Sequence, residues 1–150
     1  MNWYSAKDIS NAPAHDDAIL SAGLNVVLIR PEIAPNAGNI SRLCYASGTK
    51  LHIVGKPGFD IKTDSQFKRA AVDYWDRLDI KRYENFEEFE NSIEMKPDGE
   101  KPGVILTSTN GRSLYFDYKY RPGDYIVFGP ESSGIEASLL ERHAASTVRI

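Results

Sequence analysis

Three segments rich in glycine and small polar residues carry the groups best suited to bind a small molecule. They span residues 31–39, 107–111 and 129–134, and each follows a short apolar run. Glycine lets a ligand approach the main chain closely, where peptide N–H and C=O groups can recognise it. Because ordinary turns use the same residue types, this composition predicts a binding site without naming its ligand.

Several common catalytic patterns do not occur in the sequence. No Gly-x-Gly-x-x-Gly follows the first apolar run, and there is no Gly-Lys-Ser/Thr phosphate loop. No Ser-His-Asp arrangement or pair of carboxylates stands out, and His143 is interpreted as a structural residue. A Rossmann dehydrogenase and a P-loop enzyme are therefore disfavoured.

The cysteine and histidine residues give no sign of a metal site. Cys44 is the only cysteine, so no internal disulfide and no cysteine-based zinc site can form. Its apolar surroundings predict a small buried side chain rather than a nucleophile. His15, His52 and His143 do not have the spacing of metal ligands, so we expect no metal cofactor.

Apolar runs alternate with amphipathic segments along the chain. The predicted strands are residues 24–29, 51–54, 78–83, 104–107, 125–128 and 147–150. The predicted helices are residues 36–47, 64–72, 86–95 and 137–144. This alternation predicts an α/β fold in which helices flank a mostly parallel sheet. Ligands bind beyond the carboxyl ends of strands in such sheets, and the three glycine-containing segments lie at those ends.

Individual residues mark where some of these elements begin and end. Pro31 and Pro35 predict an extended loop between the first strand and the first helix. Gly48 is placed to end that helix, and Asp64 is placed to cap the next one.

The bulk properties fit one soluble domain. A chain of 150 residues suits a single core. Residues 1–23 are polar and irregular, so we expect a poorly ordered extension before a domain at residues 24–150. The sequence has neither a secretory signal nor a membrane-spanning run. These features predict a cytoplasmic protein that does not bind membranes.

The charge distribution leaves two interpretations open. A net charge of −3 argues against unspecific coating of nucleic acid. Cations gather in the middle of the chain, at Lys62, Lys68, Arg69, Arg77, Lys81 and Arg82. Such a stretch is typical of a local RNA-binding patch but also of a solvated helix face.

Three ordered motifs resemble those of the TrmL-type (YibK-type) RNA methyltransferases of the SPOUT superfamily. Residues 31–44 resemble the first motif, residues 128–135 resemble the second, and residues 69–75 resemble a TrmL-specific segment. The resemblance extends over residues 24–150. It implies that S-adenosylmethionine is the methyl donor and that the acceptor is the ribose 2′-oxygen of the tRNA wobble nucleotide.

The same resemblance implies an architecture and a set of cofactor contacts. It implies a SPOUT-type fold with a deep trefoil knot near the C-terminal end, a homodimer, and the tRNA anticodon stem-loop as partner. Its cofactor contacts correspond to Leu106, Gly129 and Ile150. The family's third motif, which closes the knot, would follow residue 150. The resemblance therefore implies a C-terminally incomplete domain, and we expect weak or no activity from it.

Arg42 is the residue that the resemblance assigns to catalysis. A guanidinium is always protonated, so it cannot act as an ordinary base. It can orient a phosphate and stabilise negative charge that develops on the 2′-oxygen. The alternative is an ion pair with Glu32 or Glu131 that holds two loops together.

Four residues are the implied RNA contacts. Asn39 either contacts the RNA or caps a helix. Lys68 and Arg69 are suited to phosphates, and Tyr74 either stacks on a base or belongs to the core.

Two rival functions remain open. One is a non-catalytic RNA-binding or dimerisation remnant of such an enzyme, and the other is a SPOUT methyltransferase that acts on ribosomal RNA. RNA affinity without cofactor affinity would favour the remnant.

Overall fold

The computed structural model describes residues 23–72, 77 and 79–150. The expectations for the extension before residue 23 and for Tyr74 lie outside the described residues.

Within the described residues, seven strands form one sheet with the order β3-β2-β1-β6-β4-β7-β5. The strands are β1 (Asn25–Ile29), β2 (Lys50–Val54), β3 (Ile80–Tyr83), β4 (Val104–Ser108), β5 (Ser113–Leu114), β6 (Tyr125–Phe128) and β7 (Thr147–Arg149). Each neighbouring pair is parallel. The predicted mostly parallel sheet is therefore confirmed.

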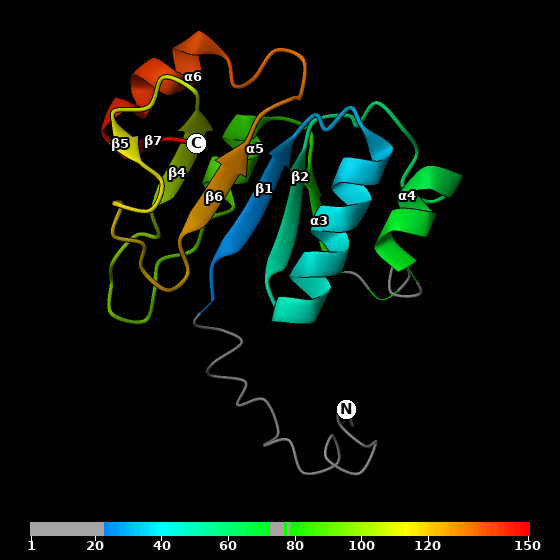
Figure 1. Ribbon diagram of the computed structural model, residues 1–150. Helices are drawn as coiled ribbons and strands as arrows, with labels where there is room; N and C mark the ends of the chain where they lie inside the picture. Colours follow the sequence, from blue (N-terminus) through cyan, green and yellow to red (C-terminus); the bar gives the residue numbers. More distant parts are fainter. Residues whose placement is uncertain (1–22, 73–76, 78) are drawn as a thin grey trace, which may run out of the picture.

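Helices lie on both faces of the sheet, and on the face of α3 and α4 they leave β4 and β6 open to view (Figure 1). They are α3 (Ala34–Ser47), α4 (Ser65–Ala71), α5 (Phe86–Asn91), α6 (Ala137–Arg142) and the short 3-10 helix η2 (Ala144–Ser146). One core cluster joins Leu28 and Leu51 of the sheet to α3 and α4. A second joins Val27 and Val127 to the rings of α5 and to Leu139 of α6. The predicted α/β class is confirmed, and the trefoil knot stays a prediction.

The ends of the helices depend on individual side chains. Gly48 ends α3 in the left-handed conformation with φ 68°, as predicted. Asp64 caps α4 by accepting hydrogen bonds from the backbone N–H groups of Gln66 and Phe67 at 2.9 and 2.8 Å. That prediction is also confirmed.

Two of the predicted boundaries that were wrong have a clear physical cause. The loop expected to reach Pro35 ends earlier, because α3 begins at Ala34 and Pro35 lies in its first turn. Proline is tolerated there because the first turn leaves its N–H groups without helical partners. The helix expected to reach residue 95 ends at Asn91, where the Ser92 hydroxyl donates to the Phe89 carbonyl at 2.7 Å. Such a side-chain bond competes with the helical backbone pattern.

Gly38 lets α3 and α4 approach each other closely. A Cβ atom at this position would lie 2.6 Å from both the Cβ of Ala70 and the carbonyl oxygen of Phe67. Real side chains do not tolerate such contacts, so only glycine fits here. The tight packing fixes α4, which carries Lys68 and Arg69, against the helix that carries Arg42.

His52 is a buried polar residue at the centre of an aromatic cluster. It is 3% exposed, and its Nδ1 and Nε2 atoms lie 3.0 Å from the Tyr83 hydroxyl and 3.4 Å from Oδ1 of Asn25. This network suits a neutral ring that accepts at Nδ1 and donates at Nε2. Burial, helped by the charges of Lys81 and Lys50, lowers the pKa of His52 to about 4.

The lowered pKa of His52 predicts a loss of stability in mild acid. The unfolded chain binds a proton near pH 6.5, whereas the folded chain does so only near pH 4. Stability therefore falls as the pH decreases through this window and levels off below it, by up to about 3 kcal/mol. Urea unfolding across this range is expected to give a flatter profile for His52→Gln than for the wild type. Parallel profiles would contradict this account of His52.

Candidate functional site

The carboxyl ends of β1, β6, β4 and β7 lie side by side at one edge of the sheet (Figure 1). The loops that follow β1, β4 and β6 are the three glycine-containing segments that the sequence singled out. Because all four strands run in the same direction, these loops converge beyond one edge. The predicted position of the binding site is in agreement with this geometry.

A cavity of about 530 Å³ opens at this edge beyond β4, β6 and β7. It is lined by Thr107, Ser108, Thr109, Asn110, Phe128, Gly129, Glu131, Ser133, Gly134, Ile135, Leu140 and Ile150. This volume is within the range of about 300–1,000 Å³ that small-molecule sites occupy. Among these described lining residues Glu131 is the one charged side chain, so the cavity suits a ligand without net negative charge.

Two of the three predicted cofactor residues line this cavity. Gly129 begins the loop after β6, and Ile150, which is 63% exposed, follows β7 directly. Leu106 does not line it, because its side chain is 0% exposed and packs in the core on the α5 and α6 side of the sheet. The residues that follow it in β4, beginning with Thr107, line the cavity instead.

Gly129 permits a close contact within its own loop. A Cβ atom there would lie 2.5 Å from the backbone carbon of Gly134 and 2.5 Å from the backbone nitrogen of Ile135. The loop thus folds back over the end of β6, and its backbone forms one wall of the cavity. A side chain at residue 129 would force that wall to move.

Two glutamates connect the loop after β1 to the loop after β6. The Glu131 carboxylate accepts hydrogen bonds from the backbone N–H groups of Glu32 at 2.8 Å and Ile33 at 3.3 Å. In return, the Glu32 carboxylate accepts from the backbone N–H and the hydroxyl of Ser132, both at 2.8 Å. These four hydrogen bonds hold the loop after β1 and the loop after β6 together beside the cavity.

The same contacts determine the ionisation of Glu131. Partial burial raises its pKa, but hydrogen bonds from the backbone N–H groups of Glu32, Glu131 itself and Ile33, and from the Asn36 side chain, outweigh burial and hold the pKa below its usual value. Glu131 is therefore a carboxylate at neutral pH. It places a negative charge on the wall of the cavity.

Arg42 and Asn39 lie on the outer side of α3. Asn39 lines a groove of about 400 Å³ between α3 and β6, and Gly129 and Glu131 border both this groove and the cavity. Arg42 follows Asn39 by three residues, so the two share a helix face. Arg42 is exposed and makes no hydrogen bond or ion pair with any residue that the structure describes. Its side chain is therefore available to a ligand.

The alternative roles weighed for these two residues were wrong. Glu32 and Glu131 bond to each other's loops, so Arg42 does not form the ion pair considered for it. Asn39 lies inside α3, whose N-cap is Ile33, so it does not cap the helix. Lys68 and Arg69 both lie in the last turn of α4.

The residues predicted from the sequence leave out part of the cavity lining. Leu140 was predicted only as part of a helix, whereas Ser133 lies in the segment 129–134 that was predicted to bind a ligand. The role of Glu32 also went unnoticed, although its place in a motif beside a strand end was a usable signal. Its partner Ser132 lies 100 positions away in the sequence, and no local pattern connects the two.

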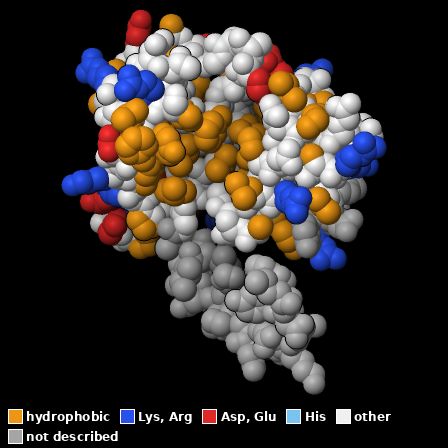
Figure 2. Space-filling view, in the orientation of Figure 1, with side chains coloured by type: hydrophobic (Ala, Val, Ile, Leu, Met, Phe, Trp, Pro, Cys, Tyr) orange, Lys and Arg blue, Asp and Glu red, His pale blue; other side chains and the backbone are white. Residues whose placement is uncertain are grey.

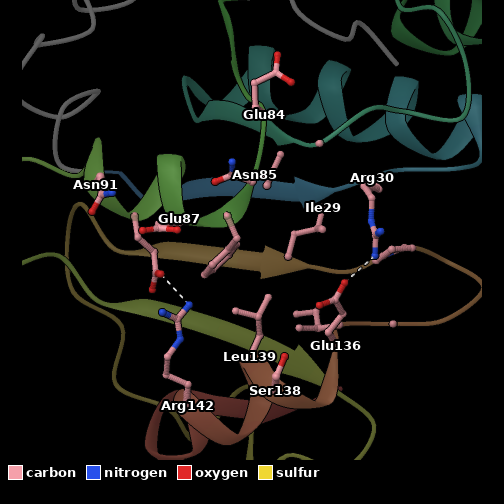
Figure 3. Close-up of a pocket in the computed structure, with 17 residues that line it drawn as sticks. Ile29, Arg30, Glu84, Asn85, Glu87, Asn91, Glu136, Ser138, Leu139 and Arg142 are labelled. Carbon is pink, nitrogen blue, oxygen red and sulfur yellow. Dashed lines mark hydrogen bonds and ion pairs between the residues drawn. The ribbon is translucent and has the colours of Figure 1, made fainter.

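A second cavity of about 560 Å³ lies on the α5 and α6 side (Figure 3). Its two arginines stand at opposite ends and are paired, Arg30 with Glu136 at 3.1 Å and Arg142 with Glu90 at 2.7 Å. Because both cations already have carboxylate partners, this space offers no ready site for an anion. It shares the wall formed by residues 134–135 with the first cavity.

The described residues also limit other kinds of site. Among them, no three His, Cys, Asp or Glu side chains gather in a way that would hold a metal ion. No helix in the described part of the chain is long and apolar enough to cross a membrane. Cys44 is buried, and burial raises the pKa of its thiol to about 11, in agreement with a structural residue.

The parallel sheet, the convergent loops and the cavity define an α/β domain with a candidate ligand site at the carboxyl edge of its sheet. The chain matches the SpoU rRNA Methylase family over residues 23–150, and it belongs to that family.

Similar proteins agree with this membership. The chain is 37% identical over 118 residues to the tRNA (cytidine(34)-2′-O)-methyltransferase of Aeromonas hydrophila. The matched residues make up 79% of this chain and 71% of that protein. A solved structure that concerns "the 2-OH methylation of C/U34 on tRNA" superposes on this chain with a TM-score of 0.76 and 35% sequence identity. The superposition covers 87% of this chain and 80% of the chain in that structure.

A more distant structure shares the fold alone. The SpoU methyltransferase AviRb from Streptomyces viridochromogenes, in complex with the cofactor AdoMet, is 23% identical with a TM-score of 0.73. The superposition covers 92% of this chain and 53% of the AviRb chain.

Proposed function

We propose that this protein transfers a methyl group from S-adenosylmethionine to the ribose 2′-oxygen of nucleotide 34, the wobble nucleotide, in tRNA. The observation that carries the proposal is the cavity beyond β4, β6 and β7, walled by the second-motif loop and joined to the first-motif helix through Glu32 and Glu131. The similarity to enzymes named for methylation at cytidine 34 supports the choice of substrate.

The cavity fits the proposed cofactor. S-adenosylmethionine supplies an electrophilic methyl group on a positively charged sulfonium. The Glu131 carboxylate, as the charged group in the lining, provides a negative charge near that cation. Backbone groups of residues 129–134 and the hydroxyl groups at the end of β4 provide hydrogen bonds, and Phe128, Ile135 and Leu140 provide apolar contact.

Arg42 is the residue that we assign to the acceptor. Its guanidinium stays protonated, so it does not remove the 2′-hydroxyl proton. It binds the neighbouring phosphate and stabilises the negative charge that develops on the 2′-oxygen. As the O–CH3 bond forms and the S–CH3 bond breaks, S-adenosylhomocysteine would be the leaving group and the hydroxyl proton would pass to water. Asn39, on the same face of α3, is assigned to the RNA backbone. Together they hold the acceptor next to the cavity, and this alignment lowers the barrier.

The last turn of α4 is assigned to the RNA backbone through Lys68 and Arg69. Removing a cationic side chain that contacts a phosphate weakens RNA binding and makes the affinity less dependent on salt. A Lys68→Ala/Arg69→Ala variant is therefore expected to lower the slope of log affinity against log salt by about 2. Filter binding of anticodon stem-loop RNA over a salt series measures this slope. An unchanged slope would place the RNA elsewhere.

The proposal includes the oligomeric state of the protein, its location and its minimal RNA substrate. The protein acts as a homodimer in the cytoplasm, where tRNA is modified, and its minimal substrate is the anticodon stem-loop. Sedimentation of the chain with and without this RNA tests the dimer. A monomer in both states would remove the homodimer from the proposal.

Transfer of labelled methyl groups tests the function. Purified protein is incubated with labelled S-adenosylmethionine and, separately, with tRNA or ribosomal RNA from cells that lack this activity. The proposal expects label in tRNA, and full turnover would overturn the expectation of weak or no activity that the family resemblance implied. Label in ribosomal RNA alone would support the alternative substrate, and RNA binding without any label or cofactor affinity would support a non-catalytic remnant.

A further inference from the structure

The segment after β5 presents exposed aromatic rings that the proposed chemistry does not use. Tyr115 is 51% exposed and Phe116 is 65% exposed. Their ring centroids lie 5.3 Å apart at an interplanar angle of 81°. The view in Figure 2 shows hydrophobic side chains gathered over β4, β6 and the nearby β5 edge. Apolar surface of this kind is uncommon without a binding function.

The backbone that carries these rings is held in place. The Tyr115 N–H donates to the Arg149 carbonyl of β7 at 3.0 Å. The Tyr120 hydroxyl donates to the Tyr115 carbonyl at 2.8 Å. At the end of the segment, the buried Asp124 carboxylate accepts from the backbone N–H of Arg121 at 2.9 Å and of Gly103 at 2.7 Å. A surface fixed in this way loses little conformational entropy when a ligand binds.

Cations lie close to the two rings in the sequence. Residues 112–121 contain three cations, Arg112, Lys119 and Arg121, and one carboxylate, Asp117. Arg121 pairs with Glu100 at 2.8 Å. Arg112 and Lys119 are exposed and form no ion pair with any carboxylate that the structure describes. Aromatic faces beside free cations match the bases and phosphates of single-stranded RNA.

This surface lies next to the cavity. Tyr115 is bonded to Arg149, and the next residue, Ile150, lines the cavity wall. On the other side, Asn110 of the lining lies two residues before Arg112. An RNA whose target ribose reaches the cavity therefore has its neighbouring nucleotides within reach of the rings.

We propose that Tyr115 and Phe116, in a segment that also carries Arg112 and Lys119, form a stacking surface for the unpaired bases that flank the methylated nucleotide. The inference rests on the proposed function, because it takes nucleotide 34 as the target. Bases in an anticodon loop are not paired, so their faces are open to aromatic side chains. The surface positions the RNA and takes no part in the transfer itself.

A double-mutant cycle tests this surface by combining a change of the Phe116 ring with removal of the flanking RNA bases. Phe116→Leu removes the ring but keeps an apolar side chain, and Phe116→Tyr keeps the ring. Affinity is measured for an anticodon stem-loop and for the same RNA with abasic residues at positions 33 and 35. We expect Phe116→Leu to weaken binding of the intact RNA about tenfold, Phe116→Tyr to bind like the wild type, and neither to differ on the abasic RNA.

Several outcomes would overturn the stacking surface. The stacking surface is overturned if Phe116→Leu and the wild type bind the intact RNA with equal affinity. It is also overturned if Phe116→Leu loses the same affinity for the intact and for the abasic RNA. A change in sedimentation with unchanged RNA affinity would instead assign the rings to a protein contact. Wild-type methyl transfer in the same preparation separates the two proposals. If the wild type transfers label and Phe116→Leu binds normally, the stacking surface alone fails.

Discussion

Replacing Arg42 with alanine is expected to slow methyl transfer by about 100- to 1,000-fold, the usual cost of removing one group that stabilises an oxyanion. The fold and the affinity for S-adenosylmethionine are expected to stay unchanged. Arg42 is exposed and bonds to none of the described residues, so its removal leaves no buried group without a partner. Single-turnover rates at saturating cofactor measure the effect on the transfer step.

Two further variants control this experiment. Arg42→Lys keeps the positive charge but loses the planar fork that binds a phosphate through two bonds, so an intermediate rate is expected. Lys101→Ala removes an exposed cation from the loop before β4, at the opposite end of that strand, and is expected to leave the rate unchanged. A normal rate for Arg42→Ala would remove Arg42 from the proposed mechanism. A lowered melting temperature would assign it a structural role.

Replacing Gly129 with alanine is expected to weaken binding of S-adenosylmethionine at least tenfold, which corresponds to about 1.4 kcal/mol. The added Cβ would lie 2.5 Å from the Gly134 carbon and the Ile135 nitrogen and 2.8 Å from Cγ1 of Ile135. Since these are mostly backbone atoms, the loop itself must open and the wall of the cavity must move. Calorimetric titration with S-adenosylmethionine measures the loss.

Gly99→Ala is the matched control for this loop. Gly99 has φ +81° and a Cβ atom there would meet nothing within 4 Å, so alanine adds backbone strain without a clash. It lies in the segment before β4, far along the strand from the cavity. We expect normal cofactor affinity from Gly99→Ala. Normal affinity from Gly129→Ala as well would contradict the assignment of the cavity.

The fold was largely predictable because its strands carry a strong local signal. Strands buried on both faces appear as short apolar runs, such as Val27 and Leu28 in β1, which contribute to the cores on opposite faces of the sheet. β5 has no such signal, because Ser113–Leu114 is only two residues long and forms through its pairing with β7. A strand that depends on a tertiary partner cannot be found from local hydrophobicity.

The candidate site was predictable in place but not in detail. Parallel strands bring their following loops to one edge, so the sequence motifs at residues 31–39 and 129–134 indicated where the cavity lies. Which side chains bond depends on strand order, which placed β1 next to β6. Because these strands are neighbours, the Glu131 carboxylate accepts from the Glu32 N–H and the Glu32 carboxylate accepts from Ser132, whereas Arg42 was the partner considered from the sequence.

The cofactor role of Leu106 stays a prediction. The resemblance assigned this position to the cofactor, but in the structure its side chain faces the core and is fully buried. Side chains alternate between the faces of a strand, so with its side chain in the core Leu106 would contact the cofactor through its main chain. Thr107 lines the cavity and also donates from its hydroxyl to the Val127 carbonyl at 2.9 Å.

The most direct test of the proposed function compares two anticodon stem-loops that differ in one atom. Both are incubated with the protein and S-adenosylmethionine, and the methylated nucleosides are then identified by mass spectrometry. One carries ribose at nucleotide 34, and the other carries 2′-deoxyribose there and ribose elsewhere. We predict a single 2′-O-methyl group at nucleotide 34 of the first RNA and none on the second. Equal methylation of both RNAs, or a methyl group on a base, would contradict the proposed function.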